Sequence, residues 1–259
     1  MTNLRKYGNA PFEVAVIHGG PGAPGEVAPI AKVLSSKKGV LEPIQTAKSV
    51  DGQVDELKEL LEKEGDTPIT LIGYSWGAWL AFILAARHQN LVKKLILISS
   101  GPFEKKYAAN IMKTRIRHLN TEEKNEFHSL IEKLNTPDTK DDQNIVKLFG
   151  KLISKADSYD PVPYDDEAIE LQLDVFRSVW PQAERLRESG ELLEMGKEIR
   201  CPVVAIHGDY DPHPYEGVKE PLSHTLTDFR LILLKNCGHH PWLEKRAKDK
   251  FYDVLRDEL

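Results

Sequence analysis

The pentapeptide Gly-Tyr-Ser-Trp-Gly at residues 73–77 is the strongest chemical signal in the sequence. It follows a short apolar run, Ile69–Gly73, and leads into an apolar stretch of helical length, Trp76–Ala86. A tight strand-to-helix turn of this kind holds a serine in a strained conformation and projects its hydroxyl from the sheet edge. As a bare pattern G-x-S-x-G is weak, because Gly and Ser are common. Its strand–turn–helix setting favours a nucleophilic Ser75 over a purely structural turn.

A serine hydroxyl needs a general base, and the base needs an orienting acid. The sequence has nine histidines. His239 follows the last predicted strand, Leu231–Leu234, in the loop Asn-Cys-Gly-His-His-Pro. This position is at the carboxyl end of the sheet, where sites in open α/β folds form. His240 is the neighbouring alternative. Solvated or capping roles are expected for the histidines in helical stretches, namely His88, His118, His128 and His224.

The acid is expected in the segment His-Gly-Asp-Tyr-Asp-Pro-His-Pro at residues 207–214, directly after another predicted strand. It offers Asp211, which we prefer, and Asp209, for which turn stabilisation through its own backbone is the ordinary role. The chain order serine, aspartate, histidine is the one expected when a nucleophilic serine lies on a strand-to-helix turn of an α/β sheet.

The same segment has an alternative interpretation as a metal site. His207, Asp209, Asp211 and His213 alternate as ligands of a divalent ion could. The glycine and prolines between them bend the chain, however, so the alternation need not keep the side chains on one face. With no second ligand cluster in the sequence, we predict no bound metal.

A glycine-rich turn, His-Gly-Gly-Pro-Gly at residues 18–22, follows the first predicted strand. Acyl transfer develops an oxyanion that fixed N–H donors must stabilise. We predict that the backbone N–H groups of Gly20 and Trp76 are these donors. A phosphate-binding loop is disfavoured, because the turn has neither a Lys-Ser/Thr ending nor a G-x-G-x-x-G pattern. A structural anchor is the expected role of His18.

Short β-branched runs alternate with helical patterns, which indicates an α/β fold with a parallel sheet covered by helices on both faces. Between residues 102 and 199 the strand signals stop, and charged helical patterns take their place. We therefore predict a core of residues 1–101 and 200–259, interrupted by a helical insertion. The predicted strands are Val14–Ile17, Val40–Gln45, Ile69–Gly73, Leu95–Ser99, Val203–His207 and Leu231–Leu234. The predicted insertion helices are Ala108–Leu119, Glu122–Leu134, Asn144–Ser154 and Glu167–Val179, with a polar loop at Asn135–Gln143.

Bulk properties exclude several classes of protein. The chain has 259 residues and a net charge of −5 without a concentrated Lys/Arg block, so nucleic acid is not an expected partner. No apolar run approaches the ~20 residues that span a bilayer, and no signal-peptide pattern precedes Pro11. Cys201 and Cys237 are placed at opposite ends of neighbouring strands, too far apart for a disulfide. We predict a cytoplasmic protein without membrane association.

Together these motifs resemble the α/β-hydrolase superfamily, and most closely its proline iminopeptidase branch. The resemblance implies that the second aspartate of Gly-Asp-x-Asp is the acid, favouring Asp211, and that the histidine of Cys-Gly-His-x-Pro is the base, favouring His239. It also implies an oxyanion hole from Gly20 and Trp76, and a helical cap formed by residues 102–199. The branch's Asp-Gln-Arg-Gly-x-Gly-x-Ser stretch is absent, since residues 41–49 read Leu-Glu-Pro-Ile-Gln-Thr-Ala-Lys-Ser. The N-terminus is short for the usual leading β-hairpin, so about six parallel strands are expected.

The implied activity is hydrolysis of a small-molecule ester or amide through an acyl-enzyme, without a cofactor. A carboxylesterase is favoured over an aminopeptidase. A ligand receptor with an intact triad and a lyase are the alternatives from other classes. An aminopeptidase needs cap carboxylates for the substrate ammonium, for which Asp165, Asp166, Glu167 and Glu170 are the candidates, although a solvated face is the favoured interpretation. Aromatic residues that either line a pocket or belong to the core are Tyr107, Phe127, Phe176, Trp180 and Trp242.

Overall fold

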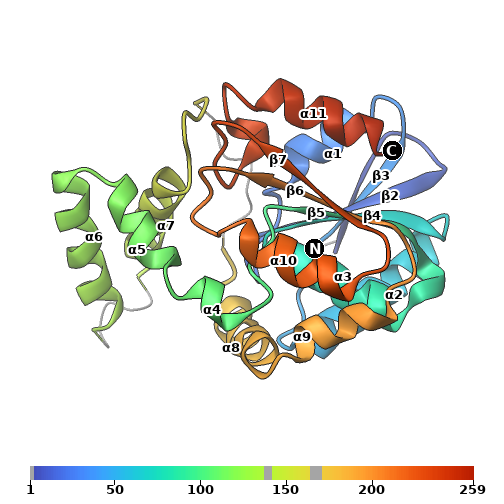
Figure 1. The fold of residues 1–259 in the computed structure, drawn as a ribbon, viewed down its shortest axis with the longest axis horizontal. Helices are drawn as coiled ribbons and strands as arrows, with labels where there is room; N and C mark the ends of the chain where they lie inside the picture. Colours follow the sequence, from blue (N-terminus) through green and yellow to red (C-terminus); the bar gives the residue numbers. More distant parts are fainter. Residues whose placement is uncertain (1–2, 137–141, 164–170) are drawn as a thin grey trace.

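The computed structural model describes residues 3–136, 142–163 and 171–259, which fold around one seven-stranded sheet (Figure 1). The strand order is β1-β3-β2-β4-β5-β6-β7. All neighbouring strands from β3 to β7 run parallel, and each overlaps one of the predicted runs. The strands are β1 (Leu4–Tyr7), β2 (Phe12–Ile17), β3 (Gly39–Pro43), β4 (Ile69–Tyr74), β5 (Val92–Ile98), β6 (Val203–Gly208) and β7 (Phe229–Leu234).

The additional strand, β1, lies at the sheet edge and pairs antiparallel with β3. Leu-Arg-Lys-Tyr carries little apolar signal, because an edge strand is only half buried and its outward residues remain polar. The Tyr7 hydroxyl donates to the buried Glu42 carboxylate on β3 at 2.6 Å. Because β1 pairs with β3 rather than with β2, the sheet has seven strands where about six parallel strands were expected.

Helices cover both faces of the sheet, as predicted. One face is covered by α1 (Ala28–Leu34) and α11 (Lys248–Asp257), which pack on Val14, Val16 and their neighbours. On the other face, helices pack against the alternate strand residues, including Ala15 and Ile17. These helices are α2 (Val50–Glu64), α3 (Trp76–Arg87) and α10 (Glu216–Thr225). Every residue of α3 before its last is buried, which explains why its sequence is apolar all round.

The residues between β5 and β6 form helices in two groups. The first contains α4 (Lys105–Ala108), α5 (Ile111–His118), α6 (Thr121–Leu134) and α7 (Gln143–Ala156). Of these, α5, α6 and α7 project from the rest of the molecule around a small apolar cluster of their own (Figure 1). The second group, α8 (Leu173–Ser189) and α9 (Glu191–Glu194), packs directly into the main core. Of the predicted loop Asn135–Gln143, residues 137–141 lie outside the described part of the chain.

The predicted helix ending at Val179 in fact continues through Pro181 as far as Ser189. Proline interrupts a helix at a cost of about 3 kcal/mol. Here Val175, Val179 and Ala183 keep one apolar stripe buried on both sides of the proline, and this burial holds the helix together. The helix ends at Gly190, whose φ of 85° gives the left-handed conformation that glycine adopts without strain.

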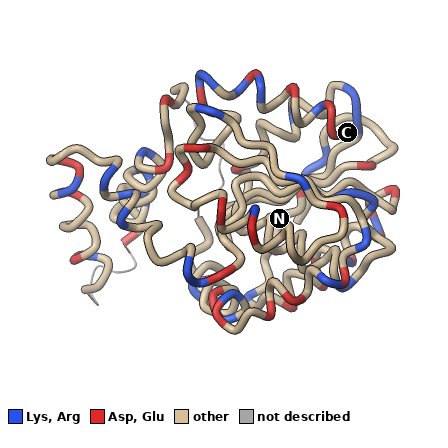
Figure 2. Tube along the Cα trace, in the orientation of Figure 1, with Lys and Arg blue, Asp and Glu red and all other residues tan. Residues whose placement is uncertain are grey.

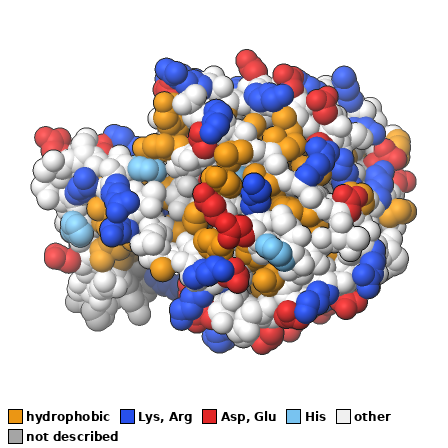
Figure 3. Space-filling view, in the orientation of Figure 1, with side chains coloured by type: hydrophobic (Ala, Val, Ile, Leu, Met, Phe, Trp, Pro, Cys, Tyr) orange, Lys and Arg blue, Asp and Glu red, His pale blue; other side chains and the backbone are white. Residues whose placement is uncertain are grey.

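Charged side chains of both signs are interleaved along the chain rather than segregated (Figure 2). The space-filling view shows the same mixture on one face, with hydrophobic side chains between the charges (Figure 3). Cys201 and Cys237 are both free, as predicted. Among the described residues, no helix has the length and apolar character that spanning a membrane requires.

Candidate active site

Ser75 lies at the turn between β4 and α3 in a strained backbone conformation, with φ 51° and ψ −113°. The flanking glycines are required by close backbone contact. A Cβ on Gly73 would lie 2.2 Å from the carbonyl oxygen of Gly77, and a Cβ on Gly77 would lie 2.4 Å from that of His18. The turn therefore needs both glycines, as the sequence pattern indicates.

Three side chains from separate strand ends form a hydrogen-bonded chain. The Ser75 hydroxyl lies 3.1 Å from Nε2 of His239, and Nδ1 of His239 donates to Oδ2 of Asp211 at 2.7 Å. Asp211 follows β6 and His239 follows β7, so the carboxyl edge of the sheet brings all three together. A hydroxyl, an imidazole and a carboxylate in this order are the groups that activate an alcohol for attack on a carbonyl.

The environment adjusts the charge states of the two ionisable members. Burial lowers the pKa of His239, and although the Asp211 charge opposes this effect, the pKa stays below the ordinary value of 6.5. Burial raises the pKa of Asp211, but the charges and hydrogen bonds of His239 and His213 outweigh burial and hold it well below its usual range. At neutral pH the imidazole is therefore free to accept a proton, while the carboxyl is ionised.

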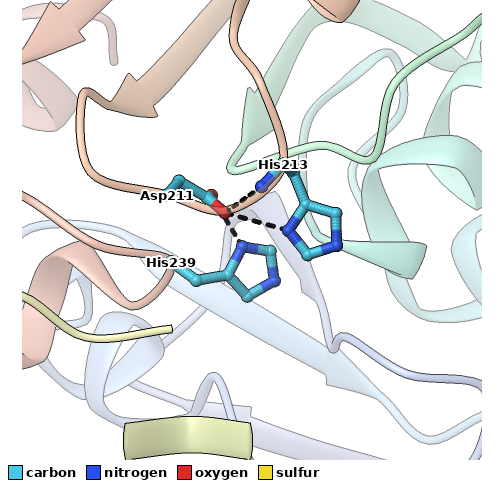
Figure 4. A group of neighbouring side chains, drawn as sticks. All are labelled: Asp211, His213 and His239. Atoms are coloured by element: carbon cyan, nitrogen blue, oxygen red, sulfur yellow. Dashed lines mark hydrogen bonds and ion pairs between the residues drawn. The ribbon is translucent and has the colours of Figure 1, made fainter. Parts of the chain in front are cut away.

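His213 is a fourth member that the sequence analysis considered only as a metal ligand. Its Nδ1 and its backbone N–H both lie 2.9 Å from Oδ1 of Asp211. Its ring stacks on that of His239 with the centroids 4.4 Å apart. Figure 4 shows the two imidazoles converging on one carboxylate. The backbone carbonyl of His213 accepts a 2.8 Å hydrogen bond from Nε2 of the buried His207, which fixes this loop from below.

The four residues whose alternation suggested a metal site do not form one cluster in the structure. Among the described residues, one group could hold a metal ion by its spacing. Its potential ligand atoms lie within 4.8 Å of one another and belong to Asp211, His213 and His239. Both Nδ1 atoms already bond to Asp211, so an ion here would displace the hydrogen bonds that orient His239. Asp209 lies elsewhere, where it accepts from the Cys237 backbone N–H at 3.3 Å.

The neighbouring candidates have other partners. Nε2 of His240 lies 3.5 Å from the Glu26 carboxylate rather than at Ser75. Burial lowers the pKa of His240, but the hydrogen bond and the charge of Glu26 outweigh burial and raise it. Asp209 is exposed and pairs with Lys235 at 3.5 Å. The geometry thus agrees with the choice of His239 and Asp211 over His240 and Asp209.

The loop that carries His239 is braced by acidic residues that the sequence did not single out. The carbonyl of Asp157 accepts the His239 backbone N–H at 2.7 Å, and the carboxylate of Asp157 binds Arg115 through two bonds of 2.6 and 2.7 Å. The fully buried Glu244 accepts backbone N–H groups from Gly238, Tyr159 and Asp160 at 2.8–2.9 Å. The sequence gives no signal that these acids are buried, because Arg115 lies 42 positions from Asp157, and Tyr159 and Asp160 lie 85 and 84 positions from Glu244.

Of the two predicted oxyanion donors, one lies at the start of a helix and the other in a turn. Trp76 is the first residue of α3, so its backbone N–H has no acceptor within the helix. Gly20 has φ 29° in the turn after β2, where its carbonyl accepts from Ala23. The contact of Gly77 with the His18 carbonyl places this turn against the start of α3. His18 is buried, its Nδ1 bonds to the Gly19 carbonyl at 2.8 Å, and burial lowers its pKa.

A cavity of about 210 Å³ opens beside Ser75. One side is aromatic, with Trp79 and Trp180 stacked 6.0 Å apart. The other predicted aromatic residues do not line it, because Phe127 and Trp242 are core residues, Phe176 stacks behind Trp180, and Tyr107 bonds to Glu220. The candidate ammonium-binding carboxylates at 165–167 and 170 lie outside the described residues. The residues with ionisable side chains that line the cavity are Arg115, Glu184, Arg187 and His213.

Comparison with known proteins identifies the fold. Residues 21–246 match the family described as alpha/beta hydrolase fold. No curated protein matches the sequence at a significant level. Among solved structures, that of VinJ is similar, with 18% sequence identity and a TM-score of 0.68. The alignment covers 98% of this chain and 93% of the VinJ chain. The meta-cleavage product hydrolase CumD from Pseudomonas fluorescens IP01 is 15% identical (TM-score 0.64; 98% and 92% covered). An N-acyl homoserine lactone degrading enzyme is 14% identical (TM-score 0.64; 99% and 96% covered).

Proposed function

Since the chain belongs to the α/β-hydrolase family, we propose that it is a serine hydrolase that cleaves a small-molecule carboxylic ester through an acyl-enzyme. The observation that carries the proposal is the hydrogen-bonded chain from Ser75 through His239 to Asp211, with distances of 3.1 and 2.7 Å. It opens onto a cavity large enough for a small substrate.

The proposed reaction has two steps. As the Ser75 oxygen attacks the ester carbonyl, Nε2 of His239 takes its proton, and Asp211 stabilises the resulting imidazolium. The tetrahedral intermediate collapses when His239 protonates the leaving alcohol, which leaves an ester bond between the acyl group and Ser75. Water then attacks this ester while His239 accepts a proton from it, and the acid and the free serine are released.

The oxyanion that forms in each step is assigned to the backbone N–H groups of Gly20 and Trp76. Trp76 supports this assignment because its N–H lies at the amino end of α3, where the helix dipole also favours negative charge. One such donor contributes about 3–4 kcal/mol to transition-state stabilisation. The strained turn at Ser75 and the close contact of Gly77 with the His18 carbonyl support a fixed spacing between the two donors.

An ester is favoured over the aminopeptidase reaction of the proline iminopeptidase branch by the charges beside the nucleophile. A free ammonium group would meet Arg115 and Arg187 in the cavity, with Glu184 as the one carboxylate among its lining residues. The chain also lacks that branch's Asp-Gln-Arg-Gly-x-Gly-x-Ser stretch. We therefore place the substrate among small esters rather than peptides with a free N-terminus, and assign no cofactor.

The test is turnover of 4-nitrophenyl acyl esters and aminoacyl 4-nitroanilides by the wild-type protein and the Ser75→Ala variant. Ser36→Ala, at an exposed serine after α1, is the matched control. Ester hydrolysis should fall on the order of 10⁶-fold in Ser75→Ala and stay unchanged in the control. Activity that survives in Ser75→Ala contradicts the proposal, and anilide cleavage without ester cleavage assigns the aminopeptidase instead. Tight ligand binding without any turnover assigns a receptor.

A further inference from the structure

Arg187 is a buried cation with unused hydrogen-bonding capacity in the cavity beside Ser75. It lies in the last turn of α8, lines the cavity, and has a side chain only 7% exposed. Within the described ranges, its Nε has no hydrogen-bond acceptor. A buried charged donor without a partner is rare in proteins and is a sign of an external acceptor.

The one carboxylate that pairs with Arg187 holds it weakly. Glu184 accepts from Nη2 at 3.1 Å, from one turn earlier on the same helix, and its side chain is 44% exposed. An ion pair of this kind is partly screened by water and contributes little. It involves Nη2 and leaves the neighbouring Nε without an acceptor among the described residues. Nε and Nη2 together form the guanidinium edge that matches a carboxylate, so a substrate carboxylate would compete with Glu184 for this edge.

The other polar groups of the cavity wall are already bonded. Trp79 donates its indole N–H to the Gly101 carbonyl at 3.0 Å, and Trp76 donates to Gln53 at 3.0 Å. Arg115 donates from Nε and Nη2 to the carboxylate of Asp157. The guanidinium of Arg187 lies over the ring of Trp79, with Cζ 5.5 Å from the ring centroid, a contact that helps to hold it at the cavity wall.

We propose that Arg187 binds a carboxylate group of the substrate, so that the esters this site prefers are half-esters or ester acids with a small apolar body. This inference rests on the proposed function and names its substrate class. The aromatic wall of Trp79 and Trp180 receives the apolar body, and Arg187 receives the negative end. A cavity of about 210 Å³ is below the ~300 Å³ at which pockets for drug-sized ligands begin, which limits the substrate to a small molecule.

The test compares charged and neutral forms of the same ester. One pair places the charge on the acyl side, namely mono(4-nitrophenyl) glutarate and its methyl ester. The other pair places it on the leaving group, namely 4-acetoxybenzoate and its methyl ester. In the wild type, kcat/KM should favour the charged member of at least one pair by about 10- to 100-fold, mainly through KM.

Arg187→Gln should abolish this preference while it retains turnover of the neutral esters, and Arg187→Lys should restore part of it. Glu184→Gln should increase the preference, because it removes the competing carboxylate. The matched control is Arg185→Gln, an exposed arginine on the same helix. Equal kcat/KM for both members of both pairs in the wild type overturns the inference. So does an equal loss on charged and neutral esters in Arg187→Gln with an unchanged melting temperature.

Binding separates this inference from the proposed reaction. Glutarate and 4-hydroxybenzoate are titrated calorimetrically into Ser75→Ala, which cannot turn over substrate. Binding of at least one, weakened about tenfold or more by adding Arg187→Gln, supports the carboxylate site even if no ester is hydrolysed. Absence of binding by both, together with hydrolysis of neutral esters by the wild type, refutes the carboxylate site and leaves the proposed function intact.

Discussion

Replacing Arg115 by methionine should destabilise the protein and slow ester hydrolysis together. Arg115 on α5 is 16% exposed, and its partner Asp157 is 3% exposed. Two charge-assisted hydrogen bonds of 2.6 and 2.7 Å join them, each worth about 1.5–3 kcal/mol. Removing the arginine leaves a buried carboxylate without its cation, a change that costs about 3–5 kcal/mol in unfolding free energy. For a chain of this size, that lowers the melting temperature by about 6–20 °C.

Activity should fall because Asp157 also holds His239, the proposed general base. Its carbonyl accepts the backbone N–H of His239 at 2.7 Å, so a carboxylate that moves toward water shifts the loop that carries the imidazole. A displacement of about 1 Å in such a group costs on the order of 10²-fold in rate. The assays are thermal unfolding followed by circular dichroism and kcat/KM on a neutral 4-nitrophenyl ester.

Two controls distinguish the loss of the ion pair from a general effect of substitution on α5. Arg117→Met changes an exposed arginine on the same helix and should alter the melting temperature by no more than about 2 °C. The double variant Arg115→Met/Asp157→Leu removes the stranded charge and should recover much of the stability, because an apolar pair can replace a buried ion pair. An Arg115→Met variant as stable as Arg117→Met, or a double variant less stable than Arg115→Met, contradicts the role assigned to this ion pair.

Two further predictions concern the base and the strained turn. His213→Phe removes a group that lowers the pKa of His239, so the acidic limb of kcat/KM against pH, which lies below 6.5 in the wild type, should move to higher pH; an unmoved limb would contradict the assigned coupling. Gly77→Ala should lower kcat/KM by about 10²-fold or more, because the new Cβ would press on the His18 carbonyl. Gly150→Ala, where a Cβ meets no atom within 4 Å, should leave kcat/KM unchanged, and equal effects of the two substitutions would rule out the steric argument.

The sequence predicts the fold, and it predicts which side chains meet at the candidate site, because both follow from local patterns. Short apolar β-branched runs locate the six parallel strands, and apolar patterns of period 3.6 locate the helices between them. Parallel strands place the residues after their ends at one sheet edge. This is why Ser75, Asp211 and His239 meet although they come from separate segments. The strand missed was β1, whose polar edge sequence has no period to detect.

The residues that tune the site were not predictable in the same way. Arg115 finds Asp157 across 42 positions, and Glu244 accepts from backbone groups 84 and 85 positions away. No local pattern encodes such pairs. Nor does the sequence show that the Nε of Arg187 lacks an acceptor among the described residues, since its charge, spacing and neighbours match those of an ordinary solvated helix. Burial is what distinguishes it, and burial depends on how α8 packs into the core.

The insertion contributes to the site in two physically separate ways. The α5 helix and the Asp157 segment brace the His239 loop through a buried ion pair and the carboxylate of Glu244. The α8 helix instead supplies Arg187 and Trp180 to the cavity and is fixed by the main core. Separating the buried carboxylates of Asp157 and Glu244 from their hydrogen-bond donors is costly in free energy. The His239 loop and the Asp157 segment must therefore remain together during turnover. A change of specificity is therefore best sought on α8, where substitution alters the cavity without disturbing the base.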